Sequence, residues 1–269
     1  MGKIRLDQRV FDLGEAESRE KAKALVMAGV VYVDGQKQTK PGTAVGEDAV
    51  IEVRGGKLPF VSRGGLKLQK ALDVFAIDPA GFTCVDCGAS TGGFTDCLLQ
   101  RGARHVYAVD VGYGQLAWSL RTDERVTVLE RTNARSLTPD MFPERMDRAV
   151  MDMSFISLRL VLPAVRSLLT EAGQVVCLVK PQFEAGREKV GKKGVVRDPA
   201  VHREVLESFV EDLDPMGFVL AGLDYSPVRG PEGNIEYLAW LKTAGESIQA
   251  DCAAVVRASH EALERREAT

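Results

Sequence analysis

Two lysines and two acids in the last three quarters of the chain could together handle a proton. Asp152 and Lys180 each close an apolar run, and Glu236 opens another. Lys67 lies in a helical segment ahead of the first predicted strand of the second domain. If these side chains converge, they could take a proton from a weakly acidic hydroxyl and hold its oxygen in line with an electrophile.

A turn rich in small residues follows that first strand and opens a helix. Its glycines let the backbone approach a ligand, and the helix start offers free N–H groups. The spacing is not G-x-G-x-x-G and the turn lacks the lysine of a P-loop, so the pattern favours S-adenosylmethionine (SAM) over a dinucleotide or a nucleoside triphosphate. The residues expected to bind the cofactor are Asp86, Gly88, Ala89, Ser90, Gly92, Gly93 and Phe94.

Two further polar residues follow the next strands. Asp110 ends the second strand of this domain, roughly twenty residues past the turn, where a carboxylate can accept both ribose hydroxyls of an adenosine. Asn133 follows the third strand and could reach the adenine. An ordinary polar loop residue is an equally good interpretation of Asn133.

Other classes of methyl transfer require residues that this chain lacks at the matching positions. Methylation of exocyclic amines typically uses Asp/Asn-Pro-Pro-aromatic, whereas the stretch here is Asp152-Met153-Ser154-Phe155. Methylation of cytosine C5 needs a nucleophilic cysteine, and Cys177 lies inside an apolar strand where a thiol is inert. A hydroxyl acceptor remains, which points to 2′-O-methylation of RNA.

Each of the two lysines and two acids named at the outset also has a plain structural interpretation. Lys67 could be a solvated helix lysine, and Lys70, one turn further on, is the rival candidate for its catalytic role. Asp152 could form a turn. Lys180 could simply end a strand, and Glu236 could be a charge that protects a sheet edge. In the catalytic interpretation, Lys180 accepts or directs the proton, and a nearby Lys67 favours its deprotonated form.

Composition is that of a globular protein of two domains. The chain has 269 residues, of which 45% are hydrophobic and 27% are charged. The net charge of −3 does not favour nucleic-acid binding, so any RNA contacts must come from local clusters of basic residues. No apolar run approaches the ~20 residues of a membrane span, and the N-terminal segment has no signal-peptide core. We expect a soluble, cytoplasmic protein.

Five cysteines, an odd number, do not indicate a disulfide framework. Cys84 and Cys87 form a C-x-x-C pattern, but their spacing sends them to opposite faces of one predicted strand. No second pair is present to complete a zinc site, so no metal is predicted.

The hydrophobic pattern changes once along the chain. Residues 1–54 predict a small α+β module, with helices over 5–13 and 17–28, strands over 30–33 and 50–53, and a tight turn at 34–35. Residues 55–61 form a linker, and 62–269 alternate strand and helix. The predicted strands of this second domain lie near 83–87, 105–110, 126–130, 147–152, 174–180, 217–224 and 235–242. The predicted helices lie over 64–75, 92–101, 114–121, 157–170, 199–213 and 245–267.

This alternation predicts an α/β fold of the Rossmann-like methyltransferase type. Its sheet should have seven strands and be mostly parallel. The last two strands are joined by a loop too short for a helical crossover, so they should pair antiparallel.

Several motifs together resemble the TlyA family. These are Ser62-Arg63-Gly64-Gly65-Leu66-Lys67-Leu68, the turn at 86–94, Asp152-Met153-Ser154-Phe155-Ile156-Ser157 and Lys180-Pro181-Gln182-Phe183-Glu184. The family joins an S4 RNA-binding domain to an FtsJ-like methyltransferase domain. The resemblance implies SAM-dependent 2′-O-methylation of cytidine in ribosomal RNA, with Lys67, Asp152, Lys180 and Glu236 as its catalytic tetrad.

Basic residues near these motifs are candidates for RNA contacts. They are Arg5, Arg9, Arg19 and Lys23 in the S4-like segment, Arg63 beside the linker, and Lys189, Lys192 and Lys193 in a glycine-containing loop after Lys180. The expected partners are ribosomal RNA or ribosomal subunits. Neither a membrane nor an obligate protein partner is indicated. An RNA-binding assembly factor with a vestigial methyltransferase fold and a membrane-active haemolysin, a label that family members also carry, remain the alternatives.

Overall fold

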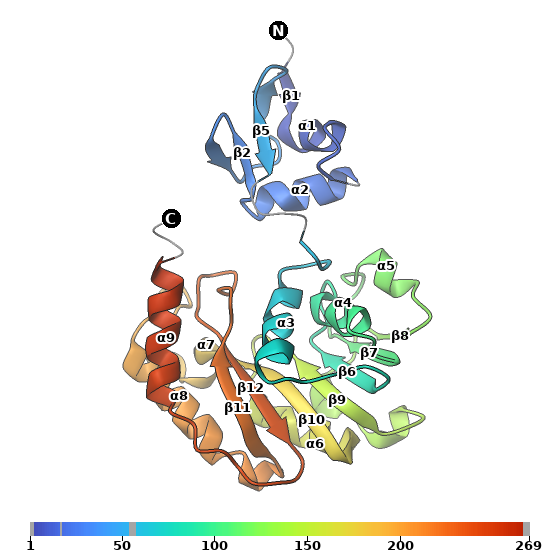
Figure 1. The fold of residues 1–269 in the computed structure, drawn as a ribbon, viewed down its shortest axis with the longest axis vertical. Coiled ribbons are helices and arrows are strands. Elements are labelled where there is room, and N and C mark those ends of the chain that lie inside the picture. Colours follow the sequence, from blue (N-terminus) through green and yellow to red (C-terminus); the bar gives the residue numbers. More distant parts are fainter. Residues whose placement is uncertain (1–2, 17, 54–57, 266–269) are drawn as a thin grey trace. The chain divides into compact units, whose positions relative to one another are not determined.

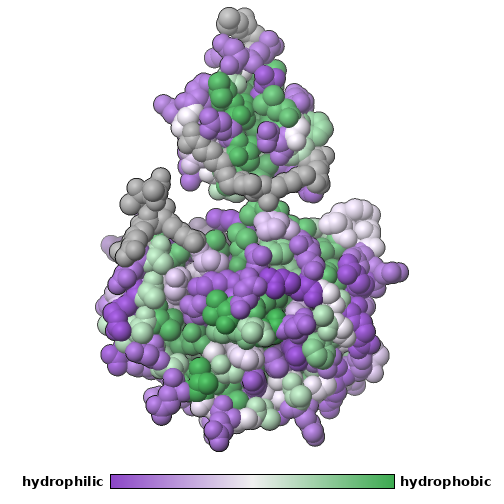
Figure 2. Space-filling view, in the orientation of Figure 1, coloured by the Kyte–Doolittle hydropathy of each residue, from purple (hydrophilic) through white to green (hydrophobic). Residues whose placement is uncertain are grey.

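The computed structural model describes residues 3–16, 18–53 and 58–265, and the chain divides into two compact units, Met1–Leu58 and Pro59–Thr269 (Figure 1). Three residues of the predicted linker, 55–57, lie outside the described residues. On the face of the larger unit seen in Figure 2, hydrophobic residues gather in groups that hydrophilic ones interrupt. None of the described helices has the length and apolarity that crossing a membrane requires.

The smaller unit packs two helices against short strands. The helices are α1 (Leu6–Asp12) and α2 (Arg19–Met27), and the strands are β1 (Lys3–Arg5), β2 (Val31–Val33), β3 (Gln36–Gln38), β4 (Ala44–Gly46) and β5 (Ile51–Val53). Leu6, Val26 and Val31 are fully buried between these elements. Asp34 and Gly35 both have positive φ, as a two-residue hairpin turn requires, and they join β2 to β3 antiparallel as predicted.

The larger unit is built on one seven-stranded sheet. Its strands are β6 (Thr83–Cys87), β7 (His105–Val109), β8 (Val126–Leu129), β9 (Met146–Met151), β10 (Leu169–Val179), β11 (Val219–Tyr225) and β12 (Tyr237–Lys242). They lie in the order β11-β12-β10-β9-β6-β7-β8. Strand β12 runs antiparallel to both neighbours, and the other pairs are parallel. This confirms the predicted mostly parallel sheet and its antiparallel final pair.

Helices cover both faces of this sheet. The α-helices are α3 (Gly64–Val74), α4 (Gly93–Gln100), α5 (Trp118–Arg121), α6 (Leu162–Leu168), α7 (Pro181–Glu184), α8 (Pro199–Glu211) and α9 (Cys252–Arg265). Short 3-10 helices are η1 (Ala134–Ser136), η2 (Pro139–Met141), η3 (Leu158–Leu160), η4 (Arg187–Lys189) and η5 (Asp214–Met216). Side chains of α3, α4 and α5 share one core cluster, and those of α6, α8 and α9 share the other. Helices α8 and α9 lie side by side (Figure 1).

Several predicted boundaries are wrong. The helix expected over 114–121 is reduced to α5, and the one expected over 157–170 is divided into η3 and α6, where Pro163 takes a place in the first turn that proline tolerates. The last helix begins at Cys252 rather than at 245, because the Asp251 carboxylate accepts a hydrogen bond from the Ala254 N–H and caps it. Residues 266–267 of that prediction lie outside the described residues. Strands β1, β3 and β4 and helix α7 were not predicted as elements, although the predicted turn at 34–35 implied a strand after it.

The cysteines behave as the pattern indicates. All five are buried and free. Cys84 packs in the cluster with α3 and α4, while Cys87 packs in the cluster on the opposite face. Within the described part of the chain, no group of His, Cys, Asp and Glu side chains is arranged to hold a metal ion.

Candidate active site

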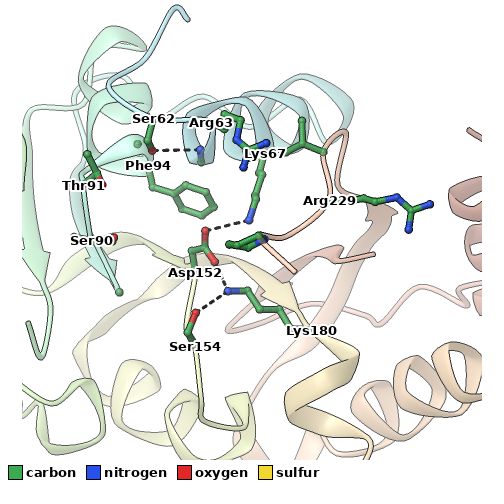
Figure 3. A pocket seen from close by; sticks show the side chains of 16 residues that line it. Ser62, Arg63, Lys67, Ser90, Thr91, Phe94, Asp152, Ser154, Lys180 and Arg229 are labelled. Atoms are coloured by element: carbon green, nitrogen blue, oxygen red, sulfur yellow. Dashed lines mark hydrogen bonds and ion pairs between the residues drawn. The ribbon is translucent and has the colours of Figure 1, made fainter. Parts of the chain in front are cut away.

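Asp152 lies between the amines of two lysines that are far apart in the sequence. Its Oδ1 is 2.6 Å from Lys180 Nζ and its Oδ2 is 3.4 Å from Lys67 Nζ (Figure 3). Lys67 Nζ is also 2.5 Å from Glu236 Oε2. The four predicted tetrad residues therefore form one connected chain of charges, Lys180–Asp152–Lys67–Glu236.

The fold explains why these residues meet. Asp152 follows β9 and Lys180 follows β10, so both lie at the carboxyl edge of the parallel strands. Because β12 is antiparallel, its beginning lies at the same edge, and Glu236 directly precedes it. Lys67 reaches this edge from the first turn and a half of α3.

Burial makes the charges of the tetrad strongly dependent on one another. The side chains of Lys67 and Glu236 are 9% and 1% exposed. Burial acts to lower the pKa of Lys67, but the charges of Asp152 and Glu236 outweigh it and raise that pKa. Burial likewise acts to raise the pKa of Asp152, but Lys67 and Lys180 outweigh it and lower that pKa. At neutral pH, Lys67 is therefore a cation and Asp152 is a carboxylate.

Lys70, the rival of Lys67, points to a different place. Its Nζ donates to the Tyr225 carbonyl oxygen at 2.6 Å and lies 3.0 Å from Asp224 Oδ2. It also lies over the Tyr225 ring. Lys70 thus fastens α3 to the end of β11, and the structure brings only Lys67 of the two to the tetrad.

Close backbone approaches explain the glycines of the 86–94 turn. Gly88 has φ +83°, and a Cβ there would lie 2.8 Å from the Asp152 carbonyl oxygen. A Cβ at Gly93 would lie 2.7 Å from the backbone nitrogen of Gly65. The turn therefore packs directly against the backbone that carries Asp152 and against the start of α3.

Two cavities of about 290 and 310 Å³ meet at this turn. Both are lined by Gly88, Ser90, Asp152 and Ser154. The first extends to the tetrad and is also lined by Ser62, Arg63, Lys67, Ala89, Thr91, Gly93, Phe94, Lys180 and Arg229. The second extends along the ends of β7 and β8 and is also lined by Asp110, Gln115, Thr132 and Phe155. Gly92 is buried beside these walls, against Leu116 and Leu120.

Asp110 is held in place by the backbone around it. Its Oδ2 accepts the Ser90 N–H at 2.8 Å and its Oδ1 accepts the Gly112 N–H at 2.7 Å. Each oxygen keeps a further lone pair for a ligand. Asn133 lies outside the linings of both cavities, and its side-chain oxygen caps η1 through the Arg135 N–H. An adenine contact of Asn133 therefore stays a prediction without support from this geometry.

Asp86 lies beneath the turn rather than in a cavity. It is fully buried, and its Oδ2 accepts both the N–H and the hydroxyl of Thr95 in the first turn of α4. Its Oδ1 has no hydrogen-bond partner among the described residues. In this structure Asp86 supports the turn from below and does not face the ligand space. Burial, with a smaller contribution from the charge of Asp152, raises its pKa to about 7.

This pKa predicts a pH effect on stability. Because the folded protein holds the Asp86 proton more tightly than the unfolded chain, the free energy of unfolding should fall as pH rises from about 4 to about 7 and then level off. The full effect is about 4 kcal/mol, at ~1.4 kcal/mol per pKa unit. Urea unfolding of wild type and Asp86→Asn across this range should give a stability difference that changes in favour of Asp86→Asn with rising pH. Parallel profiles would contradict the prediction.

Two of the four predicted RNA-binding residues of the smaller unit lie beside the same acid, Asp7. Arg5 pairs with Asp7 at 2.9 Å, and Arg19 lies 3.6 Å from the same carboxylate. Arg9 donates to the Glu47 carbonyl oxygen at 2.7 Å, and Lys23 is exposed. Asp7 thus balances part of the positive charge, while the side chains of Arg5 and Arg19 remain about half exposed.

The basic residues predicted in the larger unit divide between two places. Arg63 lines the cavity beside the tetrad. Lys189 pairs with Glu204 of α8, whereas Lys192 and Lys193 are exposed in the loop before α8. Arg63 therefore lies beside the space expected to hold the cofactor, whereas Lys192 and Lys193 lie in an exposed loop.

Sequence reasoning missed three supporting residues. Ser154 accepts a hydrogen bond from Lys180 Nζ at 3.2 Å, and Arg229 lines the first cavity from the loop between β11 and β12. Glu184 is bound by the Leu158 N–H at 2.8 Å and by the Ser157 hydroxyl at 2.7 Å. Ser154 and Glu184 stand in motifs that the sequence singled out, so their position next to Asp152 and Lys180 was the available signal.

Some known proteins similar to this chain are named methyltransferases, and others are named haemolysins. An FtsJ-like methyltransferase family model matches residues 60–243, and an S4 domain model matches residues 4–51. The 16S/23S rRNA (cytidine-2′-O)-methyltransferase TlyA of Mycobacterium tuberculosis is 49% identical over 242 residues, which cover 90% of each chain. Hemolysin A of Brachyspira hyodysenteriae is 41% identical over 88% of this chain and 98% of its own. A solved structure of a hemolysin-named protein from Streptococcus thermophilus is 45% identical, with a TM-score of 0.81 over 100% of both chains. These similarities confirm the resemblance that the motifs indicated.

Proposed function

Because the chain belongs to the FtsJ-like methyltransferase family, we propose that it transfers a methyl group from SAM to the 2′-hydroxyl of a cytidine in ribosomal RNA. The observation that carries the proposal is the tetrad, two amines joined through Asp152 at the edge of a cavity that the glycine turn also lines. The name of the Mycobacterium tuberculosis relative, at 49% identity, supports the same reaction and the same nucleoside.

The two cavities at the turn fit SAM. Asp110 presents a fixed carboxylate to the ribose hydroxyls of an adenosine, and the backbone of Gly88 to Ser90 lies between the two cavities. Arg63 and Ser62 would meet the amino-acid end at the other side. When bound, SAM supplies a methyl group on a positively charged sulfur, which is the electrophile of the reaction.

The tetrad then handles the acceptor hydroxyl. Lys67 stays protonated because its pKa is raised, so it balances the two carboxylates rather than taking a proton. Lys180 contacts one carboxylate and the Ser154 hydroxyl, and it directs or takes the proton of the 2′-hydroxyl. Asp152 holds both amines, and Glu236 fixes Lys67. Placing the oxygen behind the methyl group should contribute most of the rate.

RNA recognition is divided between the two units in this proposal. The S4 domain contributes Arg5, Arg9, Arg19 and Lys23 to phosphate contacts, and the loop before α8 contributes Lys189, Lys192 and Lys193. The target nucleotide is flipped out of its helix to reach the tetrad. Phe155 is 90% exposed, which excludes a core role, and it is available to stack on the base. A ribosomal substrate would place the protein in the cytoplasm.

Transfer of tritium from labelled SAM to purified ribosomal subunits tests the proposal. We expect incorporation into rRNA, and comparison of 2′-O-methyl positions in cells with and without this protein should reveal the modified cytidine. The absence of transfer to either subunit, together with no SAM binding by calorimetry, would instead support an RNA-binding assembly factor. Release of dye from liposomes by the pure protein would support the haemolysin name.

A further inference from the structure

A third cavity, of about 360 Å³, lies next to the tetrad. It shares Ser154 and Lys180 with the cavity at the glycine turn and also reaches Glu236, but none of the residues 88–94 line it. Its volume is within the range of about 300–1,000 Å³ that is typical of small-ligand sites. The tetrad therefore stands between a space suited to the cofactor and a second space on its acceptor side.

Aromatic side chains form one wall of this third cavity. The rings of Phe155 and Phe183 have centroids 5.3 Å apart and are tilted by 49°. Phe155 has φ +64°, a backbone conformation that is rare for a bulky residue and that tends to persist where the surrounding structure enforces it. Glu184 links the two segments, because it follows Phe183 in α7 and its carboxylate accepts the backbone N–H of Leu158 in the Phe155 loop. Phe155 is 90% exposed, so its ring is open to stacking by a planar ligand.

Gln182 adds a polar group to the same cavity. Its Oε1 has no hydrogen-bond partner among the described residues and is shielded from solvent, so the amide must rotate about its last side-chain bond to present this oxygen to a ligand in the cavity. Buried polar atoms of this kind are rare in folded proteins unless a ligand or water satisfies them. An amide offers a donor and an acceptor side by side, and the Watson–Crick edge of cytosine offers the matching acceptor, N3, and donor, the 4-amino group. Uracil presents a donor, N3–H, and an acceptor, O4, in the opposite order, so the Gln182 amide would have to rotate by half a turn to pair with it.

We infer that this third cavity receives the base of the acceptor nucleotide and that Gln182 reads its Watson–Crick edge, with a preference for cytosine. The inference rests on the function proposed above. A base held there by the aromatic wall and the Gln182 amide would leave its ribose beside Lys180, where the two cavities meet. Gln182 is then a specificity residue, since the 2′-hydroxyl itself is identical in every ribonucleoside.

The test compares rRNA transcripts that differ only in the base of the target nucleotide, once the comparison of 2′-O-methyl positions has identified it. The three bases are cytosine, uracil and a cytosine analogue without the 4-amino group. Wild type should methylate the cytidine about 10- to 100-fold faster than the other two, the range expected for one amide–base pair. Gln182→Met should methylate all three at similar, low rates, with SAM affinity unchanged. Gln249→Met, at an exposed position, is the matched control and should behave as wild type.

The outcomes separate this inference from the proposed function. No transfer by wild type to any transcript would overturn the function itself. Transfer to cytidine with an unchanged base preference in Gln182→Met would overturn only the inference. The analogue provides a test on the substrate side that needs no folded variant, because equal rates of wild type on cytidine and on the analogue would exclude a contact with the 4-amino group.

Discussion

Replacing Lys180 with alanine is expected to lower methyl transfer by about 10²- to 10⁴-fold, the range typical of a lost acid–base group. The amine lies 2.6 Å from Asp152 Oδ1 and lines both the cofactor-side and the acceptor-side cavities. Asp152 keeps its contact with Lys67 in this variant and is 21% exposed, so water can replace the lost partner. Single-turnover transfer from labelled SAM, with SAM affinity measured by calorimetry, should show lost chemistry and unchanged cofactor binding.

Lys180→Arg distinguishes proton transfer from charge balance. Arginine keeps the positive charge and can still pair with Asp152, but it does not release a proton at accessible pH. If Lys180 takes the hydroxyl proton, Lys180→Arg should be nearly as slow as Lys180→Ala. Substantial activity of the arginine variant would show that the site needs only a cation there.

The sheet and its edge could be predicted because they depend on patterns along the chain. Apolar runs bounded by turn residues identified all seven strands of the larger unit, and the short loop after Tyr225 indicated the antiparallel pair. Carboxyl ends of parallel strands share one edge, so Asp152 and Lys180 could be expected to be neighbours before any coordinates were known.

Side-chain direction could not be predicted in the same way, because it depends on packing between distant elements. Lys67 and Lys70 are one turn apart on α3, and only the position of β11 sends Lys70 to Asp224. Asp86 stands in a turn that suggests a ligand contact, yet Thr95 of α4 covers its carboxylate. Phe155 likewise combines a positive φ with an exposed ring, and no sequence pattern specifies either feature.

Lys67→Met is expected to reduce both stability and activity. The variant leaves the Glu236 carboxylate, 1% exposed, without the amine that lies 2.5 Å from it. Breaking a buried ion pair on one side costs about 3–5 kcal/mol, because the remaining charge is buried without a partner. Asp152 also loses the cation that orients it from α3. Urea unfolding should measure the first effect, and transfer of labelled methyl groups should measure the second.

A double variant separates the two effects. Lys67→Met/Glu236→Leu removes both charges and fills the site with apolar side chains of similar size, so much of the lost stability should return while methyl transfer stays low. Lys70→Met is the matched control on the same helix. Its pair with Asp224 is more exposed than the pair of Lys67 with Glu236, so its loss should cost less stability, and its activity should match wild type. Recovery of full activity in the double variant would show that Lys67 serves only to neutralise Glu236, and that the chemistry belongs to Lys180 and Asp152 alone.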